Sequence, residues 1–355
     1  MNKLFHLLIF IISLLAATKW FFTKPRVLVY SPDIVGTIEY FDPRVRGLLA
    51  VLKETNTQFG ELLHTIPGKR FLKNLMSRRR VAWYLEAGNF LPLVFQLVKP
   101  KQIWILDDLR YWHIIIKAAE HSGIPVYAFQ HGRFYPGMPI TGAMPTHWWV
   151  WNAYWRERLI ALRSFFMAHA DRIAIGGRSQ TSEAISLPLH GDTVTLLMPY
   201  ETAAKPSEIR RYIERLLELP HVRIIFKLRP DYSHETQILQ YHLDEFKAGD
   251  RLRVVFNLQS HELTEVDAVL GTYSTMLYEM IEIGKPIGIL EASTTQAEDL
   301  LSEHLAELVN LRDDIDMQIS HLTSTSPDVL LRRAQKLRVD RDLKITLQKL
   351  LTLHG

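Results

Sequence analysis

After Pro25, short apolar runs alternate with longer amphipathic stretches, and this alternation constrains the fold more than any other feature of the sequence. A short apolar run bounded by turn residues is typical of a buried strand, and its alternation with amphipathic helices is typical of β–α units around a parallel sheet. The pattern occurs in two series, separated by a segment rich in Gly, Ser and Thr at 176–191. We therefore expect an α/β chain with two doubly wound, Rossmann-like lobes.

The expected strands are short and mostly apolar: Arg26–Tyr30, Val81–Glu86, Gln102–Leu106, Val126–Phe129 and Trp148–Trp151 in the first series, and Val194–Leu197, Arg223–Lys227, Val254–Phe256, Ala268–Leu270 and Ile287–Leu290 in the second. The expected helices are Tyr111–His121, Ala153–Met167, Ser207–Glu218, Thr275–Ile283 and Ala297–Leu305, with one or two more after Ser326. Two such lobes facing one another would place a ligand cleft at the carboxyl ends of both sets of strands.

The N-terminal segment differs from the rest of the chain. Leu4–Phe22 is almost entirely apolar and is followed by Lys24 and Arg26. Its least interrupted part, Leu7–Ala17, is short for a bilayer span of about 20 residues. A signal peptide, a signal anchor, an interfacial helix and an ordinary buried helix therefore remain open. We favour a membrane anchor helix over residues 1–25, with the globular part at the cytoplasmic face of the inner membrane.

Composition excludes several classes of chemistry. The sequence contains no cysteine, which excludes disulfides, thiol catalysis, Cys-ligated zinc and iron–sulfur clusters. The net charge of +4 over 355 residues is too weak to indicate a nucleic-acid partner. No His-Glu-x-x-His motif or other metal-ligand spacing occurs, so we expect neither a bound metal nor a resident cofactor.

The segment 269–289 carries the clearest candidate site. An apolar strand ends at Leu270, Gly271 permits a tight turn, and Ser274 and Thr275 open a helix. Free backbone N–H groups and two hydroxyls at a helix start form a ready site for a phosphate. Glu279 follows Thr275 by four residues on the same helical face, where a carboxylate suits the hydroxyls of a ribose. A plain helix cap, with Glu279 as a solvated surface charge, is the alternative.

A second candidate lies at the end of the strand Arg223–Lys227. Lys227 and Arg229 are two residues apart, so both leave the same face of the strand end. Paired cations at the carboxyl end of a strand fit a nucleotide phosphate. The alternative is that these charges simply mark the end of the strand.

In the first lobe, the apolar strand Val126–Phe129 runs directly into Gln130, His131 and Gly132. Gly132 would let the backbone approach a ligand, while His131 could act as a general base or stabilise a departing phosphate. A histidine at a strand end is also common as a structural residue.

These segments, in this order on this pattern, resemble the GT-B glycosyltransferases of bacterial surface-polysaccharide synthesis, a group that includes Kdo-transferase-like, sialyltransferase-like and CDP-glycerol glycerophosphotransferase-like enzymes. The resemblance covers roughly residues 26–290 and rests on Gln130-His131-Gly132, Lys227-Leu228-Arg229-Pro230, Ser274-Thr275, Glu279 and Gly284-Lys285-Pro286. In such families the second and third motifs bind the phosphates of the donor nucleotide, and the Gln-His-Gly loop faces the cleft. Arg229 stands where those families usually have histidine, which keeps a cation but loses a titrating group.

The resemblance implies a GT-B-like fold with an acceptor-side lobe over 26–185 and a nucleotide-donor lobe over 186–355, the latter including the C-terminal helices. It implies a metal-independent transfer of a sugar from a nucleotide-sugar co-substrate to a glycan or lipid-linked acceptor. Asp108, after the strand Gln102–Leu106, becomes a candidate general base, with helix capping as the alternative. The segment 176–178 resembles the interdomain loop that closes on the donor.

Three other functions fit the same pattern. A glycerophosphate or polyol-phosphate transferase would use the same phosphate contacts. A nonhydrolysing sugar-nucleotide epimerase also has two such lobes. An inactive glycan-binding subunit of an assembly complex would bind saccharide without nucleotide.

The aromatic run Trp148–Trp151 is compatible with a sugar or membrane surface, but we favour a core strand.

Overall fold

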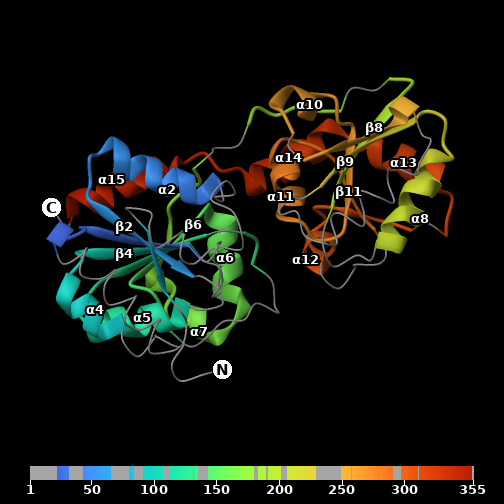
Figure 1. Ribbon diagram of the computed structural model, residues 1–355. Helices are drawn as coiled ribbons and strands as arrows, with labels where there is room; N and C mark the ends of the chain where they lie inside the picture. The colour runs from blue at the N-terminus through green and yellow to red at the C-terminus, as the bar shows by residue number, and fades with distance from the viewer. Residues whose placement is uncertain are drawn as a thin grey trace. The chain divides into compact units, whose positions relative to one another are not determined.

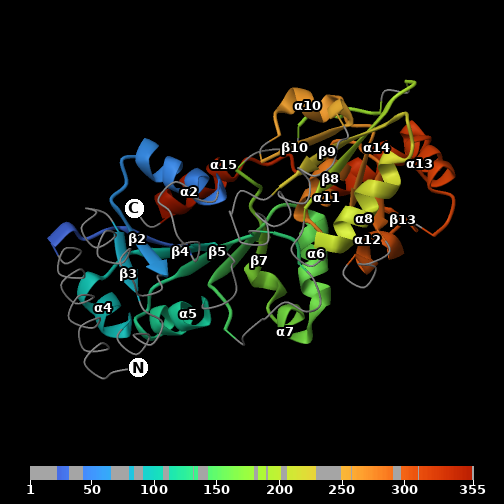
Figure 2. The same cartoon turned by 45° about the vertical axis from the view of Figure 1, so that its right-hand side comes forward.

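Figures 1 and 2 show a computed structural model of the protein. The structure describes residues 22–31, 43–64, 80–83, 91–106, 112–130, 132–134, 143–179, 183–188, 191–200, 206–228, 249–256, 258–290, 297–310 and 312–353. The chain divides into two compact units, of which the first comprises Met1–Thr181 with Asp340–Gly355 and the second Ser182–Val339. Each unit is built on one parallel sheet.

The first sheet has seven strands in the order β3-β2-β1-β4-β5-β6-β7. Their bounds are Val27–Ser31 (β1), Phe59–His64 (β2), Arg80–Trp83 (β3), Gln102–Leu106 (β4), Val126–Phe129 (β5), His147–Val150 (β6) and Ile173–Ile175 (β7). Strand β1 lies inside the sheet. Strands β2 and β3 follow on one side of it, and β4 then pairs with the other side of β1. This reversal is the topological switch point of a doubly wound sheet.

Helices cover both faces of the first sheet. Figures 1 and 2 show α2 and α15 on one face and α4 and α5 on the other. The helices of this unit are Pro43–Glu54 (α2), Leu91–Val98 (α4), Trp112–His121 (α5), Ala153–Leu162 (α6), Ser164–Met167 (α7) and Leu343–Leu353 (α15), with a short 3₁₀ helix, Ala170–Arg172 (η2), before β7.

The second sheet repeats this plan with six strands in the order β10-β9-β8-β11-β12-β13. The strands are Val194–Pro199 (β8), Val222–Lys227 (β9), Leu252–Val255 (β10), Ala268–Gly271 (β11), Ile287–Leu290 (β12) and Glu307–Val309 (β13). The helices are Pro206–Leu217 (α8), Ser260–Thr264 (α10), Thr275–Glu282 (α11), Glu298–Ser302 (α12), Ile315–Thr323 (α13) and Pro327–Leu337 (α14), with Gly249–Arg251 (η3) before β10. The predicted pair of doubly wound sheets is confirmed.

The aromatic run at β6 belongs to the core. Trp148 and Trp155 are fully buried, and the ring of Phe134 contacts both of them edge-on, with centroids 5.6 and 5.7 Å apart. Phe166 of α7 packs on Trp148 at 5.4 Å. The core-strand interpretation is therefore confirmed for Trp148, and these rings fix the helices that follow β6.

Some predicted elements differ from the structure. The expected helix Ala153–Met167 is broken at Arg163, whose extended backbone (φ −156°, ψ 150°) interrupts the helical hydrogen bonds and lets α7 turn Phe166 inward. Strands β2, β7 and β13 were not expected. Gly60 and Glu61 interrupt the apolar run of β2, while β7 and β13 have only three residues each.

The chain after Asp340 belongs to the first unit, whereas we expected the whole tail in the second lobe. Leu347 and Leu350 of α15 are buried in the same core cluster as Val29 and Leu52. Two amphipathic helices, α14 and α15, do form after Ser326, as expected. Both helices have the same kind of apolar pattern, so periodicity alone does not tell which sheet each one covers.

The segment 176–178, whose expected role as a loop that closes on a donor stays a prediction, is bonded to the C-terminal part of the chain. Thr346 Oγ1 donates to the Gly176 carbonyl at 2.8 Å, and Arg178 forms a parallel bridge with Asp342. The C-terminal return of the chain thus holds this segment within the first unit.

No helix among the described residues is both long and apolar enough to cross a bilayer. Residues 1–21 of the expected anchor lie outside the described residues.

Candidate functional site

The carboxyl edge of the second sheet is the candidate site. Strand β8 lies between β9 and β11, and the chain reverses its direction of winding between β8 and β11. Ligands of open α/β sheets bind outside the carboxyl ends of the strands at such a switch point. The residues that end β9 and β11 therefore form the candidate site.

Strand β11 passes into α11 through a tight turn. A Cβ at Gly271 would lie 2.7 Å from Leu277 Cδ2, so glycine allows the helix to start close to the strand. Ser274 is the N-cap, and its Oγ accepts a hydrogen bond from the Met276 N–H at 3.2 Å. Thr275 is the first residue of the helix, as predicted. The N-terminal end of α11, with its positive partial charge, thus lies at the carboxyl edge of the sheet.

Thr272 is a further polar residue at this edge, and sequence reasoning missed it. Its side chain is buried, with 5% exposure, and Oγ1 has no hydrogen-bond partner among the described residues. Leaving a buried hydroxyl unpaired costs about 1–3 kcal/mol. A ligand oxygen at the start of α11 would supply the missing partner. The available signal was a hydroxyl residue directly after a buried strand, one position beyond Gly271.

Lys227 ends β9, as predicted, and its side chain is half-buried. The Tyr200 N–H donates to the Lys227 carbonyl at 2.9 Å, which ties the ends of β8 and β9 together. Because β8 separates β9 from β11, Lys227 lies two strand spacings, about 10 Å, from Gly271 along the edge. Glu279 is half-buried and lies one turn into α11. A cation, three hydroxyl residues and a helix N-terminus therefore share one edge of the sheet.

In the first unit, Gln130 fixes the chain where it leaves β5. The Gln130 side chain is 3% exposed, its Nε2 donates to the Gly132 carbonyl at 2.8 Å, and its Oε1 accepts from the Trp151 N–H at 2.9 Å. Trp151 Nε1 donates to the Gln130 carbonyl at 3.1 Å. Sequence reasoning assigned Gln130 no role of its own; a polar residue directly after a buried strand was the only signal. Gly132, which was expected to let the backbone approach a ligand, is held in this turn because its carbonyl accepts the hydrogen bond from Gln130.

Three predicted site residues lie outside the described residues: His131, Asp108 and Arg229. Their expected roles therefore stay predictions. Within the described residues, no group of three or more His, Asp or Glu side chains could hold a metal ion.

Comparison with known proteins identifies the fold through structure rather than sequence. No protein-family model matches the chain, and no curated protein sequence matches it either. Many solved structures do match. The glycosyltransferase of kitacinnamycin superimposes with a TM-score of 0.59 at 11% identity, covering 92% of this chain and 98% of that one.

Two further structures cover almost the whole chain. MurG of Acinetobacter baumannii matches with a TM-score of 0.57 at 11% identity, over 92% of this chain and 99% of that one. The UDP-GlcNAc 2-epimerase of Neisseria meningitidis, bound to UDP-GlcNAc, matches with a TM-score of 0.56 at 13% identity, over 92% and 99%. At this level of identity the similarity shows the fold alone: the chain has a GT-B-like fold, shared by glycosyltransferases and by a sugar-nucleotide epimerase.

Proposed function

We propose that the protein is a glycosyltransferase that moves a sugar from a nucleotide-sugar donor to a glycan or lipid-linked acceptor in bacterial surface-polysaccharide synthesis. One observation carries the proposal. On one edge, the switch point of the second sheet combines the capped N-terminus of α11, the cation Lys227 and the buried Thr272 hydroxyl, which has no hydrogen-bond partner among the described residues. Helix N-termini, hydroxyls and lysines are the groups that bind phosphates in α/β folds.

In this proposal the second unit holds the donor. The N-terminus of α11 and Lys227 contact the donor phosphates, together with Arg229, which is two residues after the end of β9 in the sequence and lies outside the described residues. Glu279 accepts hydrogen bonds from the ribose hydroxyls. The nucleotide leaves with the electron pair of the sugar–phosphate bond, and the positive end of α11 with Lys227 stabilises the negative charge that develops on the phosphate.

The first unit would hold the acceptor. His131 or Asp108 takes the proton from the acceptor hydroxyl as its oxygen attacks the anomeric carbon, or His131 stabilises the departing phosphate. Gln130 holds the backbone on either side of His131, because its side chain bonds to Gly132 and Trp151. A membrane anchor over residues 1–25 would place this reaction at the cytoplasmic face of the inner membrane, where lipid-linked acceptors occur.

A sugar-nucleotide epimerase is the second candidate, favoured by the match to UDP-GlcNAc 2-epimerases over more than nine-tenths of the chain. The two functions differ in what happens to the donor alone. An epimerase changes the sugar configuration without an acceptor, whereas a transferase leaves the configuration of unused donor unchanged and releases its nucleotide much faster when an acceptor is present. NMR of each nucleotide sugar incubated with the full chain separates them.

The first test is a thermal-shift panel of CMP-, UDP-, GDP- and CDP-linked sugars on the full chain. We expect one nucleotide class to raise the melting temperature, since a ligand that binds only the folded state stabilises it. Lys227→Ala and Thr272→Val should each reduce that shift, because they remove a phosphate contact while Val keeps the shape of Thr. Arg223→Ala removes an exposed cation from the start of the same strand and serves as the matched control. Equal shifts in all four proteins would contradict the proposed site.

A further inference from the structure

The amino edge of the first sheet collects exposed lysines from distant parts of the sequence. In a parallel sheet the connecting helices run opposite to the strands, so each helix ends at the edge where the next strand begins. The Lys101 N–H donates to the Arg26 carbonyl at 2.9 Å, and the Arg26 guanidinium donates to the Leu351 carbonyl. The segments before β1 and β4 and the end of α15 thus meet at this edge.

One sign of charge dominates there. The exposed lysines of the segments 22–26, 53–58, 96–101, 119–125 and 349–353 are Lys24, Lys53, Lys99, Lys101 and Lys349. The carboxylates of the same segments are Glu54, which pairs with Lys344, and Glu120. The edge is therefore cationic, although the protein as a whole has a weak net charge.

Apolar side chains are exposed beside these lysines. Helix α4 reads LPLVFQLV and carries one polar side chain, Gln96. Four of its residues are buried, but Leu93 and Leu97, one turn apart on the outer face, are each 46% exposed. A helix that is apolar on all sides is normally buried. We therefore expect the exposed outer face of α4 to contact an apolar partner. Phe22 (82% exposed) and Leu353 (74%) add apolar surface at the same edge.

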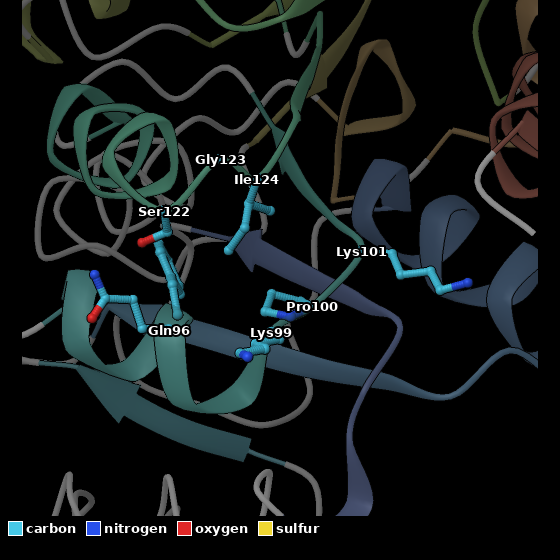
Figure 3. A pocket seen from close by; sticks show the side chains of 8 residues that line it. Gln96, Lys99, Pro100, Lys101, Ser122, Gly123 and Ile124 are labelled. Atoms are coloured by element: carbon cyan, nitrogen blue, oxygen red, sulfur yellow. The ribbon is translucent and has the colours of Figure 1, made fainter.

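A hollow of about 500 Å³ lies at the end of α4 (Figure 3). It is lined by residues of α4, the segment before β4 and the turn after α5, including Phe95, Lys99, Pro100 and Gly123. Figure 3 shows Lys99 and Lys101 extending in different directions from the two sides of Pro100. The hollow is thus flanked by cations and provides space for a small anionic headgroup.

We infer that this surface, consisting of Leu93, Leu97, Lys24, Lys99 and Lys101, binds an anionic lipid bilayer. Leucines enter the boundary between headgroups and acyl chains, while lysines extend to the anionic headgroups. Each lysine near an anionic leaflet strengthens binding roughly fivefold. The cationic charge favours a bilayer over a second copy of the chain, whose matching surface would repel it.

The absence of cysteine from the sequence allows a site-specific test on the full chain. Leu97→Cys carries a polarity-sensitive fluorophore, and Leu308→Cys in the second unit is the control, because Leu97 and Leu308 are 46% and 49% exposed. Both labelled proteins are mixed with vesicles of phosphatidylcholine, with or without phosphatidylglycerol, and bound protein is isolated by flotation. We expect a blue shift at position 97 only, dependent on phosphatidylglycerol and reduced by salt.

The charge contribution has its own test. Lys99→Glu combined with Lys101→Glu should weaken binding: the lipid concentration that gives half of the maximal blue shift at position 97 should rise more than tenfold. Arg211→Glu combined with Arg223→Glu makes the same charge change on exposed residues of the second unit and should have little effect. Circular dichroism melting confirms that each variant is folded.

Three outcomes would overturn the inference. The first is floated protein whose probe at position 97 stays in a water-like environment, since binding would then use another part of the chain. The second is the absence of any binding to phosphatidylglycerol vesicles. The third is a concentration-dependent blue shift without lipid, which would indicate that a second copy covers the surface. None of these outcomes depends on whether the protein transfers a sugar.

Discussion

The two units share one strand order, but they build their cores from different residues. All eight tryptophans belong to the first unit, where Trp104, Trp148 and Trp155 are fully buried. The main core of the second unit is largely aliphatic, with Leu196, Ile224 and Leu270 among its fully or almost fully buried residues. The doubly wound order therefore depends on the β–α alternation and not on one kind of core residue.

The units also differ in the groups that raise or lower their stability. In the first, the C-terminal return packs α15 against α2 and pairs with the segment 176–178. In the second, the described residues include a buried lysine, Lys285, and a polar cluster around Glu307. Because tryptophan fluorescence reports only the first unit while circular dichroism reports both, variants in each unit can be followed separately.

The largest effect is expected from Gly177→Ala in the first unit. Gly177 has φ +87°, and a Cβ there would lie 2.0 Å from the carbonyl oxygen of Arg341. The substitution combines a strained backbone with a clash against backbone, so we expect a loss of about 4 kcal/mol in the free energy of unfolding. The tryptophan-detected transition should shift strongly.

Gly123→Ala is the matched control for backbone strain without a clash. Gly123 also has a positive φ, +66°, but nothing lies within 4 Å of its added Cβ. The cost should be about 1 kcal/mol. Equal losses for both variants would mean that contact with Arg341 contributes little to the first unit.

The next effect has the opposite sign and lies in the second unit. Burial lowers the pKa of Lys285 to about 8, against a smaller opposing effect of the Asp267 carboxylate. Lys285 is 1% exposed, and its Nζ donates to Ser186 Oγ at 3.3 Å. The usual lysine pKa of about 10.4 applies to the unfolded chain, so the folded state binds the proton less tightly. Below pH 8 Lys285 is protonated in both the folded and the unfolded state. Burial of its charge then lowers the free energy of unfolding by the full amount, about 3 kcal/mol.

Stability should therefore rise with pH between about 8 and 10.4, where the unfolded state binds more protons. Lys285→Met should stabilise the second unit by about 2 kcal/mol at pH 7, less than the full penalty because the hydrogen bond to Ser186 is lost. Lys285→Met should also remove the increase in stability between about pH 8 and pH 10.4. Denaturation followed by circular dichroism at pH 7 and pH 10 measures both. The exposed Lys349→Met is the control; an unchanged pH dependence in Lys285→Met would disprove the assignment.

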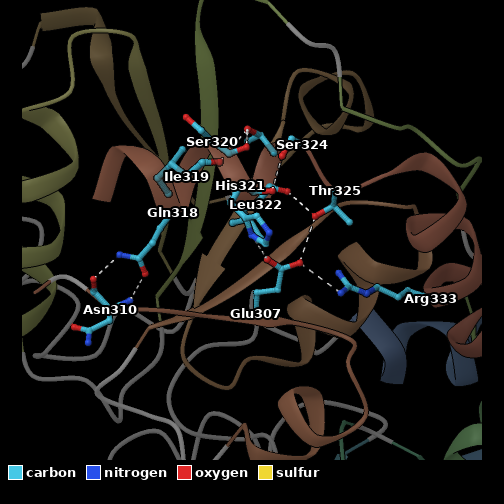
Figure 4. Close-up of polar contacts among 11 residues, drawn as sticks. Glu307, Asn310, Gln318, Ile319, Ser320, His321, Leu322, Ser324, Thr325 and Arg333 are labelled. Atoms are coloured by element: carbon cyan, nitrogen blue, oxygen red, sulfur yellow. Dashed lines mark hydrogen bonds and ion pairs between the residues drawn. The ribbon is translucent and has the colours of Figure 1, made fainter. Parts of the chain in front are cut away.

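Glu307 in the second unit should give a smaller loss (Figure 4). Its carboxylate lies 3.0 Å from His321 Nδ1 and 3.5 Å from Arg333 Nη2. Arg333 Nε and Nη1 are buried without a hydrogen-bond partner among the described residues. Glu307→Gln leaves this half-buried guanidinium without a carboxylate, at a cost of about 1–2 kcal/mol.

Glu303→Gln is the comparison for Glu307→Gln, because Glu303 has a similar exposure, 28% against 26%, but pairs with the more exposed Lys336. Such surface pairs contribute about 0–1 kcal/mol. Chemical denaturation followed by circular dichroism measures both losses. A larger loss for Glu303→Gln would show that burial of Arg333 does not determine how much Glu307 contributes to the free energy of unfolding.

Local patterns in the sequence predicted most of the second unit's candidate edge. Gly271, Ser274 and Thr275 mark a strand end, a cap and a helix start through chemistry that operates within a few residues. Residues that depend on distant packing were not predictable in the same way. Thr272 and Gln130 look like ordinary polar loop residues until the sheet buries them.

The same reasoning explains the position of the tail. The apolar periodicity of Leu343–Leu353 predicts an amphipathic helix, yet its place beside α2 depends on the contact of Leu347 and Leu350 with the core cluster that contains Leu52. That contact joins segments far apart in the sequence, so no local pattern encodes it. Strands β7 and β13 were missed for a related reason, since three residues are too few to show a period.

The smallest stability effect concerns Ser274, and it separates two roles of that residue. Ser274→Ala removes the cap of α11 and should cost the second unit about 1 kcal/mol. Ser274→Asp keeps a good cap and adds a favourable charge at the helix start, so stability should stay within about 0.5 kcal/mol of the original or rise. If α11 binds the phosphates of a nucleotide sugar, the added carboxylate should nevertheless abolish the ligand-induced thermal shift. A retained shift in Ser274→Asp would mean that the helix start is only a structural feature of the second sheet, and that its resemblance to a phosphate site comes from the capping chemistry alone.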